Sequence, residues 1–164
     1  FNQIQFYDFQ TTYFLSNEWW RLVTPMFIHF SPTHLIFNSL WIYILGREIE
    51  QLDGKIIFIF LILFTSASSN YLQYSFSGPS LFGGLSGVVY GLLGYCFVSE
   101  TFLRINKFSF PPAIYIFMFV WLLIGFTGFL DLLGFGKIAN FAHLGGLLSG
   151  ILSGYIFSMY NKKT

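Results

Sequence analysis

The stretch Gly83-Gly84-Leu85-Ser86-Gly87-Val88-Val89-Tyr90-Gly91 contains glycines four residues apart, at 83, 87 and 91. The same spacing returns near the end of the chain, at Gly146, Gly150 and Gly154. Small residues at this spacing allow two helix backbones to approach closely in lipid, where no hydrophobic force drives helices together. The pattern predicts that two helices pack against each other through their glycine faces. Packing alone would be a sufficient reason for these glycines.

The composition indicates that the solvent of this chain is lipid. Of its 164 residues, 55% are hydrophobic, 23% aromatic and only 9% charged, whereas soluble domains carry roughly 25% charged residues. So few charges cannot cover a water-exposed surface. The net charge of +1 argues against a nucleic-acid partner, and a single cysteine excludes a disulfide framework. Since no long polar or proline-rich linker interrupts the chain, we expect one domain over residues 1–164.

Five apolar segments have nearly the length of about 20 residues that a bilayer core requires. They cover about 33–50, 55–74, 85–103, 112–132 and 138–160. Residues 1–33 instead alternate polar side chains with aromatic ones, and Trp19-Trp20-Arg21 is typical of a headgroup-level anchor. The expected fold is therefore an all-α polytopic membrane bundle of five spans, preceded by an interfacial loop on the outer side.

The basic residues predict the orientation in the membrane. If the five spans alternate, Arg21 and Lys137 lie on one side, and the other side holds six basic residues: Arg47, Lys55, Arg104, Lys107, Lys162 and Lys163. The positive-inside rule then places the C-terminus in the cytoplasm and residue 1 outside. Because no signal peptide begins the chain, we expect a further span to precede residue 1.

Three polar groups from three predicted spans lie at a similar depth. Ser86 precedes Arg104 by 18 residues and His143 precedes Lys162 by 19, which places both roughly 27–29 Å above the inner charges at 1.5 Å per residue. His34 lies roughly 20–32 Å above them on the same basis. We therefore expect these three side chains to meet in the outer leaflet.

Serine and histidine together suggest nucleophilic catalysis. A serine hydroxyl attacks poorly until a neighbouring base takes its proton, and imidazole has a suitable pKa. Alone, Ser86 more often caps a helix or bonds to its backbone, and His143 could be a haem ligand, a proton relay or an interhelical hydrogen-bond partner. No carboxylate lies within a turn of His143. A dyad is therefore favoured over a triad, with Tyr90 as a candidate to support the imidazole ring.

Further polar residues could complete such a site. His34 and Asn38 share one helix face at i and i+4, and with the Ser86 backbone N–H they could form an oxyanion hole. A capping histidine and a packing asparagine would be the structural alternative. His29 lies in the interfacial loop and is more readily explained as a tie to its neighbours. The second span carries polar residues that either line a wet cavity or pack against a helix: Thr65, Ser66, Ser68, Ser69 and Asn70.

Four motifs stand in a fixed order along residues 19 to 154. They are Trp20-Arg21, His34-Leu35-Ile36-Phe37-Asn38, Gly84-Leu85-Ser86-Gly87, and Ala142-His143 followed by Gly146 and Gly150. In this order the chain resembles the bacterial rhomboids, a family of intramembrane serine proteases. Each motif alone is a weak signal, whereas the four together are a strong one.

The resemblance implies a role for each matching residue. It implies Ser86 as nucleophile and His143 as general base, with an oxyanion hole formed by His34, Asn38 and the Ser86 amide. Supporting roles fall to Tyr90, Gly84, Gly87, Gly146 and Gly150. It implies no metal or cofactor, a bacterial inner-membrane location, and a six-helix core of which this chain holds five helices. It also implies transmembrane protein substrates, cleaved after small residues and reached from the lipid or beneath a loop cap at residues 134–137.

Two other classes of function compete with a protease. Non-catalytic rhomboid-like proteins bind membrane clients, but such relatives usually lack the serine or the histidine, and both are present here. A haem or metal protein could use His29, His34 and His143. It is disfavoured because the chain has no HExxH motif and no second ligand pair at helical spacing.

Overall fold

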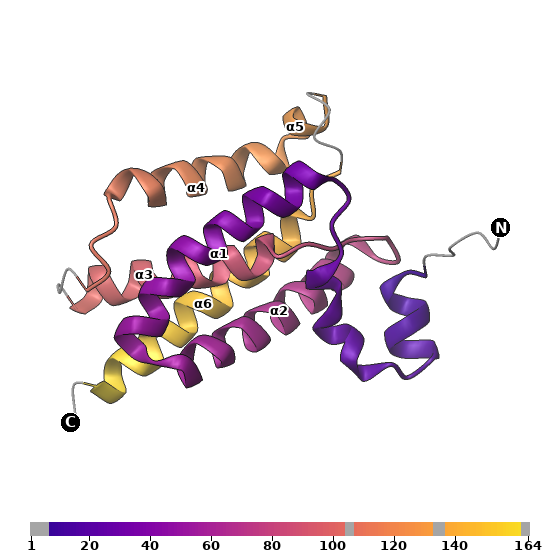
Figure 1. The fold of residues 1–164 in the computed structure, drawn as a ribbon. Coiled ribbons are helices and arrows are strands. Elements are labelled where there is room, and N and C mark those ends of the chain that lie inside the picture. Colours follow the sequence, from indigo (N-terminus) through magenta and orange to yellow (C-terminus); the bar gives the residue numbers. More distant parts are fainter. Residues whose placement is uncertain (1–6, 104–106, 133–136, 162–164) are drawn as a thin grey trace.

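The computed structural model describes residues 7–103, 107–132 and 137–161, and these form helices and no strand (Figure 1). The α-helices are α1 Pro32–Asp53, α2 Lys55–Ser77, α3 Ser86–Leu103, α4 Pro112–Phe126, α5 Phe129–Leu132 and α6 Asn140–Asn161. Helices α1, α2, α3 and α6 form a bundle, and α4 runs along one side of it. The all-helical fold class predicted from the sequence is confirmed.

Local residues explain where the first two long helices begin and end. The Ser31 hydroxyl caps α1 by accepting a hydrogen bond from the His34 N–H at 3.1 Å, and Pro32 occupies the first turn, where its missing N–H costs nothing. Gly54 separates α1 from α2 at a φ of 89°, a left-handed conformation that favours glycine. Gly78 ends α2 in the same way, at a φ of 67°.

The fourth predicted span is interrupted, so the expectation of one helix over 112–132 is wrong. Helix α4 ends at Phe126, and α5 begins at Phe129. The Thr127 hydroxyl donates to the Ile124 carbonyl at 2.7 Å and accepts from the Phe129 N–H at 3.2 Å. Gly128 follows with a φ of 74°. A side chain that competes for backbone groups and a left-handed glycine together end the helix.

The N-terminal segment is more ordered than the expected interfacial loop. It contains three short helical segments, Gln10–Leu15, Trp19–Leu22 and Thr24–Phe27. Two polar side chains of α2 bind it: the Ser66 hydroxyl donates to the Val23 carbonyl at 3.1 Å, and the Asn70 amide donates to the Leu22 carbonyl at 2.9 Å. Part of the polar run in α2 therefore ties this segment to the bundle.

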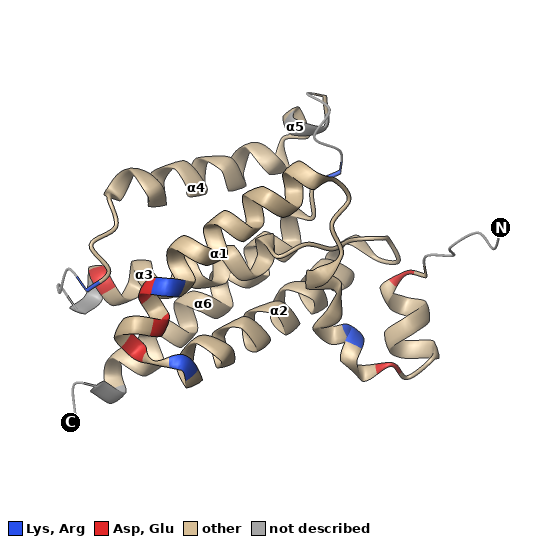
Figure 2. Cartoon of the chain, viewed as in Figure 1, with Lys and Arg blue, Asp and Glu red and all other residues tan. Residues whose placement is uncertain are grey.

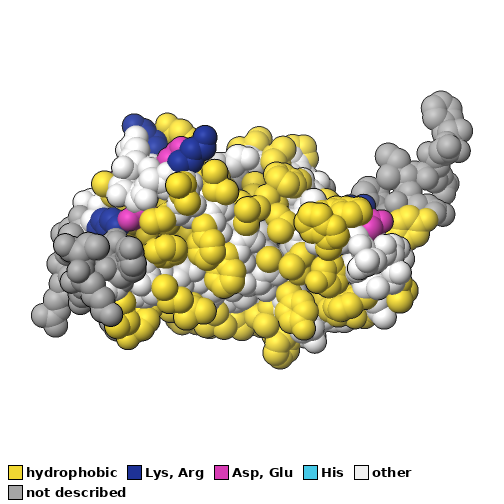
Figure 3. All heavy atoms as spheres, turned by 90° about the horizontal axis from the view of Figure 1, so that it is seen from below, with side chains coloured by type: hydrophobic (Ala, Val, Ile, Leu, Met, Phe, Trp, Pro, Cys, Tyr) yellow, Lys and Arg dark blue, Asp and Glu magenta, His cyan; other side chains and the backbone are white. Residues whose placement is uncertain are grey.

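The surface is apolar between two polar ends. Figure 3 shows hydrophobic side chains covering the middle of one face, with charged side chains near its two ends. In Figure 2 most charged residues gather where α1 turns into α2 and where α3 ends. Among the described residues, α2 and the part of α6 from Asn140 to Met159 are long and apolar enough to cross a membrane. The last two turns of α1 carry four charged residues, and α4 has only 15 residues, so the five-span count remains a prediction.

The glycines bring α3 and α6 into backbone contact. A Cβ atom added to Gly146 would collide with the carbonyl oxygen of Gly87, and one added to Gly150 would collide with that of Gly91. Larger side chains at these positions would therefore push the helices apart. The apolar core lies beside this contact and includes Leu92 and Cys96, both 0% exposed.

Candidate active site

Ser86 and His143 meet where α3 and α6 begin. Ser86 is the first residue of α3, and His143 is in the first turn of α6. The His143 Nε2 atom lies 2.8 Å from the Ser86 Oγ atom, and His143 is only 6% exposed. The sequence separates the two residues by 57 positions, so the close approach of the two helices is what joins them.

Tyr90 covers one face of the imidazole. Its ring stacks on His143 with centroids 4.7 Å apart and an interplanar angle of 28°. The Tyr90 hydroxyl points to another helix and donates to the Met118 carbonyl of α4 at 2.9 Å. In the part of the chain that the structure describes, no carboxylate pairs with His143. Stacking, rather than an acidic third residue, orients the ring here.

His34 and Asn38 of α1 lie against Gly84, two residues before Ser86. A Cβ atom on Gly84 would be 2.7 Å from His34 Cε1, 2.9 Å from His34 Nε2 and 3.4 Å from Asn38 Nδ2. Gly84 also has a φ of 116°, so the position requires glycine for both space and conformation. Asn38 is 3% exposed, and its buried Nδ2 atom has no hydrogen-bond partner. A buried donor without a partner is available to a reacting group.

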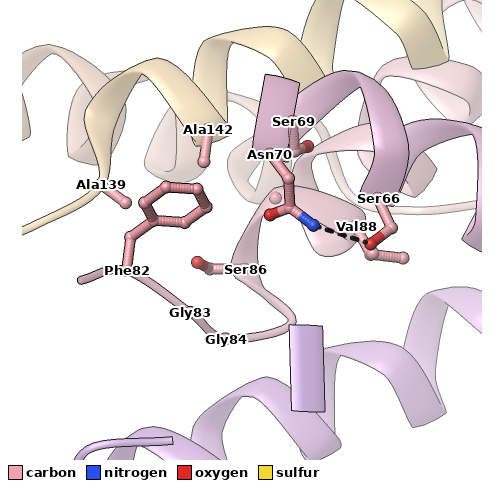
Figure 4. A pocket seen from close by; sticks show the side chains of 11 residues that line it. Ser66, Ser69, Asn70, Phe82, Gly83, Gly84, Ser86, Val88, Ala139 and Ala142 are labelled. Atoms are coloured by element: carbon pink, nitrogen blue, oxygen red, sulfur yellow. Dashed lines mark hydrogen bonds between the residues drawn. The ribbon is translucent and has the colours of Figure 1, made fainter. Parts of the chain in front are cut away.

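A small cavity adjoins the serine. Its walls come from α2, from the first turn of α3 with the segment before it, and from the start of α6. Its polar lining includes Ser66, Ser69, Asn70 and Ser86. Figure 4 shows the Ser86 side chain in this cavity beside the Phe82 ring. The space is about sufficient for one water molecule. Of the five polar residues predicted in the second span, Ser66, Ser69 and Asn70 line the cavity, whereas Ser68 and Thr65 do not. The Thr65 hydroxyl donates to the Leu61 carbonyl at 2.7 Å.

Gln73 contributes to the site although the sequence did not single it out. Its Oε1 atom accepts a hydrogen bond from the Ala142 N–H at 2.9 Å, and its Nε2 atom donates to the Ser77 hydroxyl at 2.9 Å. Gln73 thus binds the residue next to His143. A signal was available, because an amide in an apolar helix requires a partner. The predicted loop cap lies outside the described residues except for Lys137.

A family model for the Rhomboid domain matches residues 16–160 of this chain. The chain belongs to the rhomboid family. It is 36% identical over 149 residues to the rhomboid protease GlpG of Haemophilus influenzae, a match that covers 90% of this chain and 74% of that protein. It is 40% identical over 136 residues to rhomboid protease GlpG of Serratia proteamaculans, covering 83% of this chain and 47% of that protein.

A third relative extends the comparison. Rhomboid protease GlpG of Klebsiella pneumoniae is 34% identical over 149 residues, which is 91% of this chain and 52% of that protein. The rhomboid chain thus spans about half the length of the Serratia and Klebsiella relatives. Its membership identifies it as an integral membrane protein of the serine-type intramembrane protease class.

Proposed function

We propose that this rhomboid cleaves peptide bonds in or near transmembrane segments of other membrane proteins, with Ser86 as nucleophile and His143 as general base. The observation that carries the proposal is the distance of 2.8 Å between His143 Nε2 and Ser86 Oγ in a buried interface. A hydrogen bond of this length is what a nucleophile and its base require. The family membership supports the same reaction class.

In the first step the Ser86 hydroxyl attacks the scissile carbonyl carbon while its proton passes to His143 Nε2. The imidazole becomes an imidazolium, and the carbonyl oxygen becomes an oxyanion. The stacked Tyr90 ring keeps His143 in position for the transfer. The negative charge on this oxygen must then be stabilised by hydrogen-bond donors.

The oxyanion is stabilised by Asn38, His34 and the Ser86 backbone N–H. Asn38 supports this role most directly, because its Nδ2 atom is buried beside Gly84 and has no hydrogen-bond partner. Hydrogen-bond donors that are already in position stabilise an oxyanion more strongly where water is excluded. They also need no rearrangement during the reaction. The bare backbone of Gly84 leaves His34 and Asn38 room to lie this close.

The imidazolium next protonates the leaving amine, which releases the first product and leaves an acyl group on Ser86. Water then attacks the acyl carbonyl carbon while His143 takes its proton. The imidazolium returns this proton to Ser86 Oγ as the ester bond breaks, which releases the second product as a carboxylic acid. The cavity beside Ser86 has room for about one water molecule and is lined by the Ser66, Ser69 and Asn70 side chains. Its small size favours a small substrate residue next to the cleaved bond.

The substrate and location follow from the surroundings of the dyad. Large apolar side chains are exposed along the long helices, and they cover the middle of the face drawn in Figure 3. We therefore infer that substrates arrive from the bilayer as transmembrane helices. The excess of basic residues on one side supports a cytoplasmic C-terminus in a bacterial inner membrane. A protein that only binds membrane clients would not need the hydrogen bond between Ser86 and His143.

The test combines active-site labelling with proteolysis. The protein in lipid vesicles should react with a fluorophosphonate and cleave a model transmembrane substrate. Ser86→Ala should lose both, and His143→Ala should lose cleavage. Ser153→Ala removes another buried serine, whose hydroxyl donates to the Ser149 carbonyl of its own helix, and should retain both activities. Cleavage by Ser86→Ala at the parent rate would overturn the proposal.

A further inference from the structure

Two histidines lie side by side next to Gly84 and Leu85, just before the nucleophile. His29 follows the short helix Thr24–Phe27, and His34 is in the first turn of α1. Their ring centroids are 5.0 Å apart, with an interplanar angle of 65°. Both residues are partly exposed. Ser31 and Pro32 between them bend the chain into the helix, which brings together residues that helical spacing alone would not pair.

The His29 ring is oriented by a backbone carbonyl. Its Nδ1 atom lies 3.2 Å from the Phe27 carbonyl oxygen. Since a carbonyl can only accept, Nδ1 carries the proton and Nε2 presents its lone pair. The contact of Nε2 with the Leu85 N–H is long, at 3.5 Å. Metal-binding histidines typically donate one ring N–H to a carbonyl, which orients the other nitrogen toward the metal. His29 has this arrangement, because its Nε2 atom makes only the long contact.

The two Nε2 atoms face consecutive residues of the same segment. His29 Nε2 faces Leu85, and His34 Nε2 lies 2.9 Å from the position that a Gly84 Cβ would take. A tetrahedral ion bound to one nitrogen of each ring, with metal–nitrogen bonds of about 2 Å, would keep the ring centres about 5 Å apart. The observed separation of 5.0 Å matches this arrangement.

We propose that His29 and His34 bind a divalent transition-metal ion, such as Zn²⁺, Cu²⁺ or Ni²⁺, and that this ion reversibly inhibits the enzyme. Imidazole nitrogen suits these ions, whereas Mg²⁺ and Ca²⁺ prefer oxygen ligands. No described group of three His, Cys, Asp or Glu side chains could hold a metal. The site therefore has two protein ligands, with water in the other positions, and differs from a resident cofactor site.

The inhibition part of the proposal rests on the proposed function. An ion on His34 would remove that side chain from the oxyanion hole and would place a hydrated cation beside Gly84 and Leu85, next to the nucleophile. No covalent or redox step is involved, so a chelator restores activity. Metal binding itself does not depend on catalysis and can be measured in an inactive variant.

Binding is tested first, with Ser86→Ala and Zn²⁺ in a calorimetric titration. The metal should bind at one site per chain. Adding His29→Ala should weaken binding roughly ten- to hundredfold, since removing even an outer partner of a metal ligand has an effect of this size. Adding His143→Ala instead should leave binding unchanged. The proposal would be overturned if Ser86→Ala did not bind Zn²⁺. It would also be overturned if adding His143→Ala abolished binding while adding His29→Ala did not.

Inhibition is then tested with the active protein in vesicles. Micromolar Zn²⁺ should slow cleavage of the transmembrane substrate, EDTA should reverse the effect, and Mg²⁺ should have none. His29→Ala should still cleave but should need at least roughly tenfold more Zn²⁺ for the same inhibition. Equal sensitivity of His29→Ala and the parent would overturn the inhibitory role. If the parent cleaves nothing, the proposed function fails, while the titration still decides whether the metal binds.

Discussion

The α3–α6 interface and helix α4 show two different ways of joining helices in one molecule. At the α3–α6 interface, Gly146 and Gly150 lie directly on backbone carbonyls of α3. Helix α4 has no charged residue, yet many of its large side chains point outward, among them Ile116 at 64% and Phe119 at 54% exposure. The more apolar helix is thus the less closely packed one.

Hydrogen bonds link α4 to its neighbours. The Met118 carbonyl accepts from Tyr90, the Gly125 carbonyl accepts from the Asn140 amide at 2.8 Å, and the Tyr115 hydroxyl donates to Glu100 at 2.6 Å. In lipid, apolar side chains gain little by leaving the solvent, so small residues and polar contacts determine which helices associate. Ser86 and His143 lie on the interface that is fixed most closely.

The largest expected effect comes from separating α3 and α6. Gly146→Val would place a branched side chain on the Gly87 carbonyl, and we expect no stably folded protein and no cleavage, because the backbone cannot yield. Leu148→Val introduces the same residue on the exposed face of α6, where Leu148 is 53% exposed, and should fold normally. Both are compared by unfolding in mixed micelles. A stable, active Gly146→Val protein would show that the glycine contact is dispensable.

The segment leading into α4 depends on an ion pair. Lys107 bonds to Asp53 at the end of α1, and the Asp53 side chain is only 3% exposed. Lys107→Met would leave a buried carboxylate unpaired and should lower the free energy of unfolding by about 3 kcal/mol.

A control and a double variant sharpen this second prediction. Lys55→Met removes an exposed lysine at the start of α2 and should change the stability little. Combining Lys107→Met with Asp53→Asn should recover part of the loss, because the unpaired charge is gone. Equal stability of Lys107→Met and Lys55→Met would argue that the pair does not fix this segment.

The C-terminal end of α4 is held more weakly than the segment around Lys107. Asn140→Ala removes the donor to the Gly125 carbonyl and should cost about 1 kcal/mol. Cleavage should change more for bulky substrates than for slender ones if α4 then moves away from α6. An Asn140→Ala protein with unchanged stability would indicate that apolar contact alone holds this end.

The smallest effect separates two roles of Tyr90. Tyr90→Phe preserves the ring stacked on His143 but removes the hydroxyl that donates to Met118. Stability should fall by about 0.5–1 kcal/mol, with nearly unchanged kcat. Tyr90→Ala also removes the stacking and should lower kcat clearly. If Tyr90→Phe lowered kcat as much as Tyr90→Ala, the bond to α4, rather than the stacking, would position the base.

The sequence predicted the α3–α6 contact because glycine spacing is a repeating pattern along each helix. It also predicted that Ser86, His143 and His34 would lie at one depth, since helix rise converts residue counts into distance. The break at Thr127 and Gly128 was missed, because a threonine and a glycine are also tolerated inside membrane helices.

Contacts between distant single residues were missed for another reason. Nothing near Gln73 in the chain shows that it faces the Ala142 N–H, and nothing near Lys107 shows that it reaches Asp53. Such pairings depend on the rotation of each helix about its axis, which packing sets. The pairing of His29 with His34 likewise depends on the bend at Ser31 and Pro32.

The single thiol of Cys96 makes the opening of this bundle measurable as a rate. The side chain is on α3 and 0% exposed within the core, so a maleimide can reach it only when helices separate. Labelling of the otherwise unmodified protein in vesicles would then proceed at the pace of spontaneous opening. Because the reagent has one target in the chain, a mass shift on each molecule would record whether its core had opened during the exposure.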